Sequence, residues 1–239
     1  MALTVVLQQF IGQERLSTIR ELRLMPYDLA PVVPDAWPGD PVVVLVHGFC
    51  ASAGVFRPLR ARLESETGAR IATFTHAPGV GVRRIAKSLA ALVERIPAGA
   101  QITIVGHSLG GVVARWYVQE MGGHARVGRT ISLGSPFGGV AVPRYLVGTD
   151  LHEESALLKQ LRDRAPAFDV PHTSIVGGAD RLVVGLETAC LGVGDVVVLA
   201  DRGHNSLLFD EDVAGLVIDR VRTRRVPVDD SGLEEAAAE

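Results

Sequence analysis

The sequence predicts an α/β fold: a doubly wound, mostly parallel sheet of about six strands with helices on both faces. Short apolar runs rich in β-branched residues alternate along the chain with longer segments of helical periodicity. The apolar fraction is 47%, as expected if the strands are covered on both faces and are therefore continuous apolar runs. A length of 239 residues suits one domain that buries a sizeable core.

Residues 1–41 are predicted to form an N-terminal helix and a proline-rich connection, both packed on the core. Apolar side chains between Leu3 and Leu22 recur at helical spacing, which indicates a helix over residues 3–24. A membrane-surface helix is the alternative, but the polar side carries few basic residues, so packing on the domain is favoured. Prolines then recur up to residue 41 and predict an irregular connection. Because this segment is too broken for an antiparallel strand pair, we expect a reduced sheet.

Residues 42–225 are predicted to form the α/β domain itself. The strands are expected at residues 42–46, 70–74, 101–105, 129–133, 173–176 and 196–199. The helices are expected at residues 56–66, 82–95, 112–121, 153–164 and 210–222. Residues 140–170 form either a small cap or an ordinary crossover helix, and both alternatives stay open. The acidic tail, residues 226–239, is predicted to be disordered.

Charge and cysteine content exclude several classes of function. The net charge is −3 and no basic stripe is visible, which argues against a nucleic-acid partner. The two cysteines, Cys50 and Cys190, make no disulfide framework or zinc-binding spacing, and buried thiols are expected. No segment has the length of a transmembrane helix, and the N-terminus lacks the pattern of a signal peptide. We therefore expect a cytoplasmic protein, with secretion of a longer precursor left open, and the oligomeric state is not indicated.

The segment Gly106-His107-Ser108-Leu109-Gly110 carries the chemistry. A G-x-S-x-G pattern is weak by itself because glycine is common in this chain. Its context is specific, since an apolar strand precedes it and a helical segment follows it. The two glycines flank Ser108 where a Cβ would crowd a sharp strand-to-helix turn. The pattern predicts a nucleophile elbow, against the alternative of a serine that merely occupies a glycine-rich turn.

This elbow, together with Gly111, closely resembles that of α/β-hydrolase lipases and esterases. Upstream, Val46-His47-Gly48-Phe49 extends the resemblance. Downstream, Leu133-Gly134-Ser135-Pro136 is similar to a strand end found in many triacylglycerol lipases and related lipid deacylases. The resemblance covers residues 42–222 and implies the α/β-hydrolase fold with a serine nucleophile. It is specific for the superfamily and only suggestive for the substrate.

In this fold an acid and then a histidine follow the nucleophile, each on a loop after a later strand. Asp180 follows the strand expected at residues 173–176, in a loop that resembles the family's Gly-x-x-Asp-x-x-Val pattern. His204 follows the last strand and fits the family's Gly-His-x-x-(Leu/Met) pattern. The remaining acids near these loops are less suitably placed; they are Asp150, Asp169, Asp195 and Asp201. We therefore predict Ser108 as nucleophile, His204 as general acid and base, and Asp180 as the carboxylate that orients it.

Two backbone N–H groups are expected to stabilise the oxyanion of the tetrahedral intermediate. One belongs to Leu109, which follows the nucleophile at the start of a helix. The other belongs to Phe49, after His47-Gly48 at the end of the first strand. The side chains of Phe49, His107 and Phe137 are expected to contact the substrate.

The sequence thus predicts a serine carboxylic-ester hydrolase of lipase or esterase type, acting on a small-molecule or lipid ester with an apolar acyl group. It requires no cofactor and no metal, although bound calcium is not addressed by the sequence. Transient contact with a membrane surface stays open. The alternatives are a lipid deacylase or acyltransferase of the same fold, or a non-catalytic interaction module, which would usually lack one member of the triad.

Overall fold

A computed structural model describes residues 2–141 and 150–223, with side chains from residue 12 onward. Its centre is one six-stranded sheet in the order β2-β1-β3-β4-β5-β6. The strands are β1 (Pro41–Val46), β2 (Arg70–Thr73), β3 (Gln101–His107), β4 (Val127–Leu133), β5 (His172–Gly177) and β6 (Asp195–Leu199). All neighbouring strands are parallel. The predicted α/β-hydrolase fold with about six strands is therefore confirmed.

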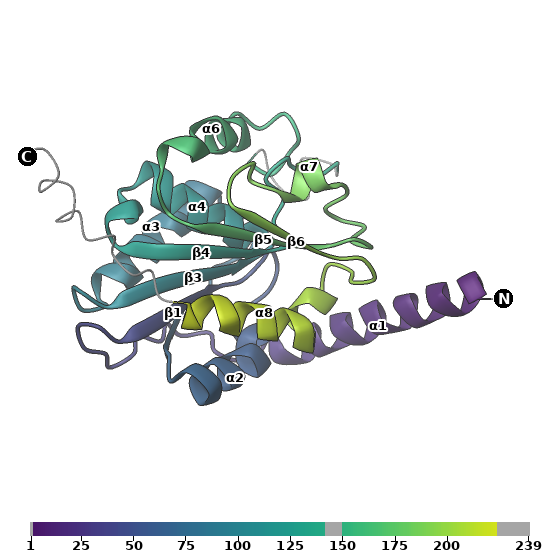
Figure 1. Ribbon diagram of the computed structural model, residues 1–239, viewed down its shortest axis with the longest axis horizontal. Coiled ribbons are helices and arrows are strands. Elements are labelled where there is room, and N and C mark those ends of the chain that lie inside the picture. Colours follow the sequence, from purple (N-terminus) through teal and green to yellow (C-terminus); the bar gives the residue numbers. More distant parts are fainter. Residues whose placement is uncertain (1, 142–149, 224–239) are drawn as a thin grey trace, which may run out of the picture.

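Helices cover both faces of this sheet (Figure 1). The helices α3 (Val82–Glu94), α4 (Leu109–Glu120) and α6 (Ala156–Arg164) pack on one face. The helices α2 (Arg57–Thr67) and α8 (Glu211–Arg222) pack on the other. Alternate residues of β1 point into the hydrophobic cores on the two faces of the sheet. Val42 and Val44 belong to the core under α3, α4 and α6, and Val43 and Leu45 belong to the core under α2 and α8. This two-sided burial explains the continuous apolar runs in the sequence.

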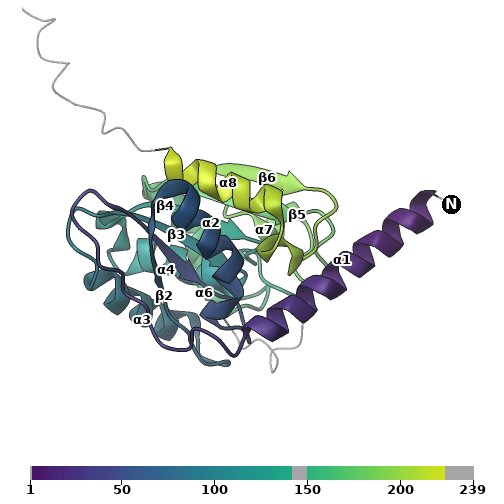
Figure 2. The ribbon, with the colours of Figure 1, turned by 90° about the horizontal axis from the view of Figure 1, so that it is seen from below.

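The helix α1 (Ala2–Leu24) extends from the body of the molecule toward the N-terminus (Figures 1 and 2). Its C-terminal part lies against the short 3-10 helices η1 (Ala53–Phe56) and η4 (Ser206–Leu208). The fit at η1 is close, because a Cβ on Gly54 would lie 2.2 Å from the Leu24 carbonyl oxygen. The polar contacts of α1 involve the loop before α8, which also carries His204. Leu16, Ile19 and Leu22 of α1 remain exposed to solvent.

Some elements begin or end at other residues than the sequence predicts. The strand β3 runs two residues further than expected, to His107, and so reaches the elbow. The helix α6 begins at Ala156, after Ser155, whose side chain accepts a hydrogen bond from the Leu158 N–H. The remaining short helices are η2 (Gly123–Ala125), η3 (Ala165–Ala167) and α7 (Leu186–Ala189).

The segment 140–170 resembles a crossover helix more than a cap where it is described. Leu157, Leu158 and Leu161 of α6 are buried in the core that α4 shares. Residues 142–149 of the segment, with Tyr145 and Leu146, lie outside the described residues, as does the predicted acidic tail.

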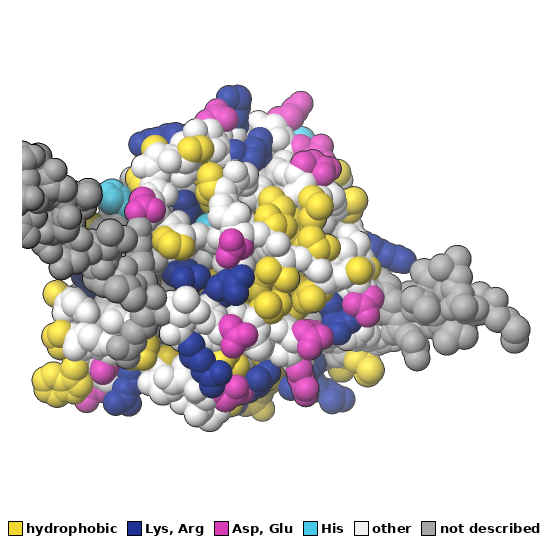
Figure 3. Space-filling model, viewed as in Figure 1, with side chains coloured by type: hydrophobic (Ala, Val, Ile, Leu, Met, Phe, Trp, Pro, Cys, Tyr) yellow, Lys and Arg dark blue, Asp and Glu magenta, His cyan; other side chains and the backbone are white. Residues whose placement is uncertain are grey.

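An apolar surface lies over the edge strand β6 and the neighbouring α7, where hydrophobic side chains gather in the space-filling view (Figure 3). Val196 and Val198 of β6 are each 47% exposed, and Val184 and Leu186 are also exposed. In the described part of the chain, no helix combines the length and apolar character needed to cross a membrane.

Candidate active site

Ser108 lies at the turn between β3 and α4 with φ 52° and ψ −122°. A non-glycine residue rarely adopts this backbone conformation, and such strain persists only where the surrounding structure enforces it. Here the Ser108 N–H donates to the Leu133 carbonyl at 2.9 Å. A Cβ on Gly106 would lie 2.3 Å from the Gly110 carbonyl carbon, and one on Gly110 would lie 2.0 Å from the Val46 oxygen. The expectation that only glycine fits on either side of Ser108 is therefore confirmed.

Asp180 and His204 lie on the loops that follow β5 and β6 at the same edge of the sheet. Their side chains are joined by a hydrogen bond of 2.7 Å from His204 Nδ1 to Asp180 Oδ2. The other carboxylate oxygen, Oδ1, accepts from the N–H groups of Leu182 at 2.8 Å and Val183 at 2.9 Å. With both oxygens bonded and the side chain 1% exposed, the carboxylate is held in one orientation.

The other acids considered from the sequence have different partners. Asp150 accepts from the Val82 N–H at the start of α3. Asp195 pairs with Arg220, and Asp201 pairs with Arg202 while remaining 71% exposed. Asp180 is therefore the carboxylate that contacts His204.

His107 connects the serine turn with the His204 loop. Its ring lies 4.8 Å from the His204 ring, centroid to centroid, and its Nε2–H donates to the His204 carbonyl at 3.2 Å. Burial lowers the pKa of His107 to about 3, so the ring is neutral at pH 7. Within the described residues, no hydrogen bond joins Ser108 to the His204 ring. Such bonds are often loose in the absence of substrate.

The loop after β1 approaches the serine through Gly48. A Cβ on Gly48 would lie 3.1 Å from both Ser108 Cβ and His107 Nδ1. Phe49 directly follows Gly48 in this loop and is half-buried. Leu109 begins α4, where the first N–H groups of a helix have no partner within the helix. Both positions are compatible with the predicted pair of oxyanion donors.

His47 and His76 support this loop through their ring contacts and hydrogen bonds. Their rings stack with centroids 3.8 Å apart. The His47 Nδ1–H donates to the Gly48 carbonyl at 2.8 Å, and His47 Nε2 accepts from the His76 N–H at 3.0 Å. Burial, assisted by His76, lowers the pKa of His47 to about 3. His76 was missed in the sequence, where nothing local indicates this contact.

The Phe137 side chain, which the sequence predicts to contact the substrate, lies in the interior of the structure. Phe137 has no exposed surface and belongs to the core on the α4 face. Its ring meets His172 edge-on with centroids 5.5 Å apart. A large apolar ring is stabilised by burial among apolar neighbours, so Phe137 is a core residue. His107 is also buried, at 2% exposure, and contacts the His204 loop.

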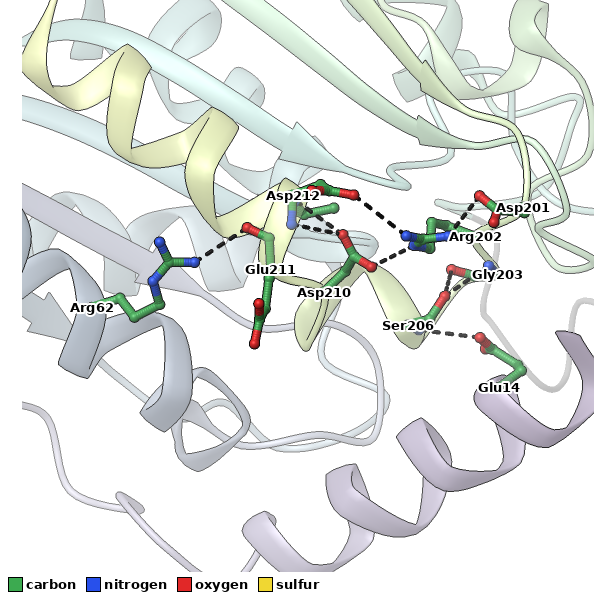
Figure 4. Close-up of polar contacts among 10 residues, drawn as sticks. Glu14, Arg62, Asp201, Arg202, Gly203, Ser206, Asp210, Glu211 and Asp212 are labelled. Carbon is green, nitrogen blue, oxygen red and sulfur yellow. Dashed lines mark hydrogen bonds and ion pairs between the residues drawn. The ribbon is translucent and has the colours of Figure 1, made fainter. Parts of the chain in front are cut away.

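Charged and polar side chains fix the loop that carries His204 (Figure 4). On one side Arg202 pairs with Asp201 at 2.6 Å, with Asp210 at the start of α8, and with Asp212 at 3.4 Å. Within the loop the Ser206 hydroxyl donates to the Gly203 carbonyl and accepts from its N–H. From α1, Glu14 accepts from the Ser206 N–H at 3.1 Å.

A cavity of about 650 Å³ opens beside His204, between α1 and the loop of Asp180. Its volume is typical of small-molecule sites. It is lined by Glu14, Arg15, Thr18, Ile19, Ala179, Arg181, Leu182, Gly203, His204 and Asn205. In the part of the chain that the structure describes, no cluster of histidine, cysteine and acidic residues could hold a metal ion.

This fold and this elbow define an α/β-hydrolase. The chain belongs to the palmitoyl protein thioesterase family, whose model matches residues 41–174.

Solved structures agree with the fold. The lipase BlEst2 of Bacillus licheniformis in its propeptide form is 17% identical with a TM-score of 0.65, over 81% of this chain and 52% of that one. Its mature form is 18% identical with a TM-score of 0.59, over 81% and 96%. A thermophilic esterase of Thermogutta terrifontis is 18% identical with a TM-score of 0.58, over 81% and 99%. No curated protein matches the chain.

Proposed function

We propose that this protein is a serine hydrolase that cleaves apolar acyl esters through Ser108, His204 and Asp180. The observation that carries the proposal is the 2.7 Å hydrogen bond between Asp180 and His204, beside a serine in the strained elbow conformation. A structural histidine–aspartate pair would give no reason for this strain at the neighbouring serine.

In the proposed mechanism, His204 accepts the Ser108 proton as the serine oxygen attacks the acyl carbonyl. Asp180 holds the ring with Nδ1–H directed at the carboxylate and stabilises the imidazolium that forms. The N–H groups of Leu109 and Phe49 stabilise the oxyanion. The imidazolium then gives its proton to the leaving oxygen as the bond to the acyl carbon breaks. Water, activated by His204, hydrolyses the acyl-serine and restores the enzyme.

Thioester hydrolysis is the second candidate, because the matching family model is that of palmitoyl protein thioesterase. The same residues perform it, with sulfur in place of the leaving oxygen. Thiolates are better leaving groups than alkoxides, so a site with this chemistry acts on both kinds of bond, and relative rates decide between them.

A fluorophosphonate probe tests the proposed function. We expect the wild type to be labelled on one peptide, which contains Ser108. Ser108→Ala and His204→Ala should lose this label and lower kcat for p-nitrophenyl esters by about 10⁴-fold or more. Rates on matched octanoyl esters and thioesters then decide which bond is preferred. If the folded wild type neither labels nor cleaves either bond, a non-catalytic interaction module becomes the better description.

A further inference from the structure

The helix α1 forms one wall of the cavity beside His204. It contributes Thr18 and Ile19, while Ala179 and Leu182 from the Asp180 loop lie on the opposite wall. Ile19 is 47% exposed and Leu182 is 41% exposed, so both apolar side chains have surface available to a ligand. The helix lies outside residues 41–174, to which the family model extends.

Direct hydrogen bonds hold α1 to the loop that carries His204. Glu14 accepts from the backbone N–H of Asn205 at 2.7 Å and of Ser206 at 3.1 Å. Thr18 Oγ1 accepts from the Asn205 side-chain amide at 3.1 Å. Figure 4 shows Glu14 reaching from α1 toward Ser206. Since Asn205 directly follows His204, the cavity wall and the histidine are fixed to each other.

The position of the cavity indicates which part of a substrate it holds. During acylation the His204 imidazolium gives its proton to the leaving oxygen or sulfur while the bond to the acyl carbon breaks. The acyl group stays on Ser108, and the alcohol or thiol departs from beside His204. The described residues that line the cavity include His204 but not Ser108, Phe49 or Leu109. A group bound there lies on the leaving-group side of the reaction.

We propose that this cavity binds the alcohol or thiol part of the substrate and that Ile19 of α1 determines how large an apolar leaving group fits. The proposal rests on the function proposed above. It predicts a preference for apolar leaving groups, because Ile19, Ala179 and Leu182 present apolar surface on both walls.

The test compares two tryptophan variants of the same helix. Ile19→Trp places a larger side chain in the cavity. Leu22→Trp is the matched control, because Leu22 is 60% exposed and does not line the cavity. One substrate series keeps the butyryl group and varies the alcohol over ethanol, 1-octanol and 2-naphthol. A second series keeps ethanol and varies the acyl group from acetyl to octanoyl.

Ile19→Trp should lower kcat/KM for octyl and naphthyl butyrate by about 10-fold or more, a typical cost of a misfitted apolar group. Its kcat/KM along the ethyl-ester series should keep the wild-type profile, as should both profiles of Leu22→Trp. The proposal is overturned if Ile19→Trp matches Leu22→Trp, or if its loss follows acyl length instead. If the wild type takes the fluorophosphonate label and Ile19→Trp gives either of these two results, only this inference is refuted. A wild type without label or hydrolysis removes both proposals.

Discussion

At the scale of single residues, the Asp180 carboxylate has the most constrained surroundings at the candidate site. One oxygen accepts two backbone N–H groups and the other accepts His204 Nδ1–H. Gly134, at the end of β4, permits this arrangement, because a Cβ there would lie 3.2 Å from Asp180 Oδ2 and 3.3 Å from His204 Nδ1. The backbone of the loop thus orients the acid, and the acid orients the histidine.

Asp180→Asn tests this orientation. An amide in this place presents its NH₂ group to Nδ1 once its oxygen has accepted the two backbone N–H groups, so the histidine adopts the wrong tautomer. We expect kcat for p-nitrophenyl butyrate to fall by about 10³- to 10⁴-fold with little change in the melting temperature. Asp35→Asn, at an exposed aspartate, is the control and should stay within about threefold of the wild type. An Asp180→Asn enzyme of normal activity would remove Asp180 from the mechanism.

At the scale of elements, the contact between α1 and the loop before α8 joins two segments that are far apart in the sequence. It depends on Glu14, whose carboxylate accepts hydrogen bonds from the N–H groups of Asn205 and Ser206. Among the described residues, neither N–H group donates to another residue of its own loop. Hydrogen bonds to a charged group are worth about 1.5–3 kcal/mol. The Glu14 carboxylate therefore adds to the packing that keeps α1 against the body.

Glu14→Ala should release these two amides. We expect hydrogen exchange at Asn205 and Ser206 to accelerate by about 10-fold or more, because an amide exchanges faster once its hydrogen bond is lost. Asn205 and Ser206 bind different oxygens of the Glu14 carboxylate. Glu14→Gln keeps only one acceptor oxygen and should therefore restore protection at only one of the two amides. Gln13→Ala, an exposed neighbour on the same helix, should leave the exchange rates unchanged. Equal rates in Glu14→Ala and the wild type would show that packing alone holds α1.

At the scale of the whole molecule, buried neutral histidines make the fold sensitive to acid. Burial lowers the pKa of His47, His107 and His172 to about 3 from a reference value of 6.5. His172 is held by Thr130 and Ser174, and the nearby charge of Arg115 adds to the effect of burial. In the unfolded chain these rings take up protons near pH 6.5, whereas the folded protein takes them up only near pH 3.

The free energy of unfolding should therefore be at its full value above pH 6.5 and fall as the pH decreases toward 3, since the unfolded state binds more protons in this range. Each histidine contributes up to about 1.4 kcal/mol per pH unit. Urea denaturation at pH 7.5, 6 and 5 measures the slope. His172→Gln should flatten it, whereas His124→Gln, at an exposed histidine, should not. A slope that is the same in His172→Gln and the wild type would contradict this account.

Local sequence patterns predict the elements and the order of the site residues. Alternation of apolar runs and helical periods is a local property, so the strands and helices were predicted within a few residues of their observed ends. The elbow at Ser108 was predicted because its glycines act on their immediate surroundings. Asp180 and His204 were predicted as partners because the carboxyl ends of neighbouring parallel strands meet at one edge of a sheet.

The distant segments that complete the site are known only from how the chain packs. The bonds of Glu14 to Asn205 and Ser206 join residues more than 190 positions apart, and no local pattern encodes such a contact. The same holds for His76 behind the loop of Phe49 and for the burial of Phe137, which looked like a substrate contact in the sequence. The physical reason is that burial and side-chain partnership follow from how the elements pack together, whereas periodicity reports only which side of an element is apolar.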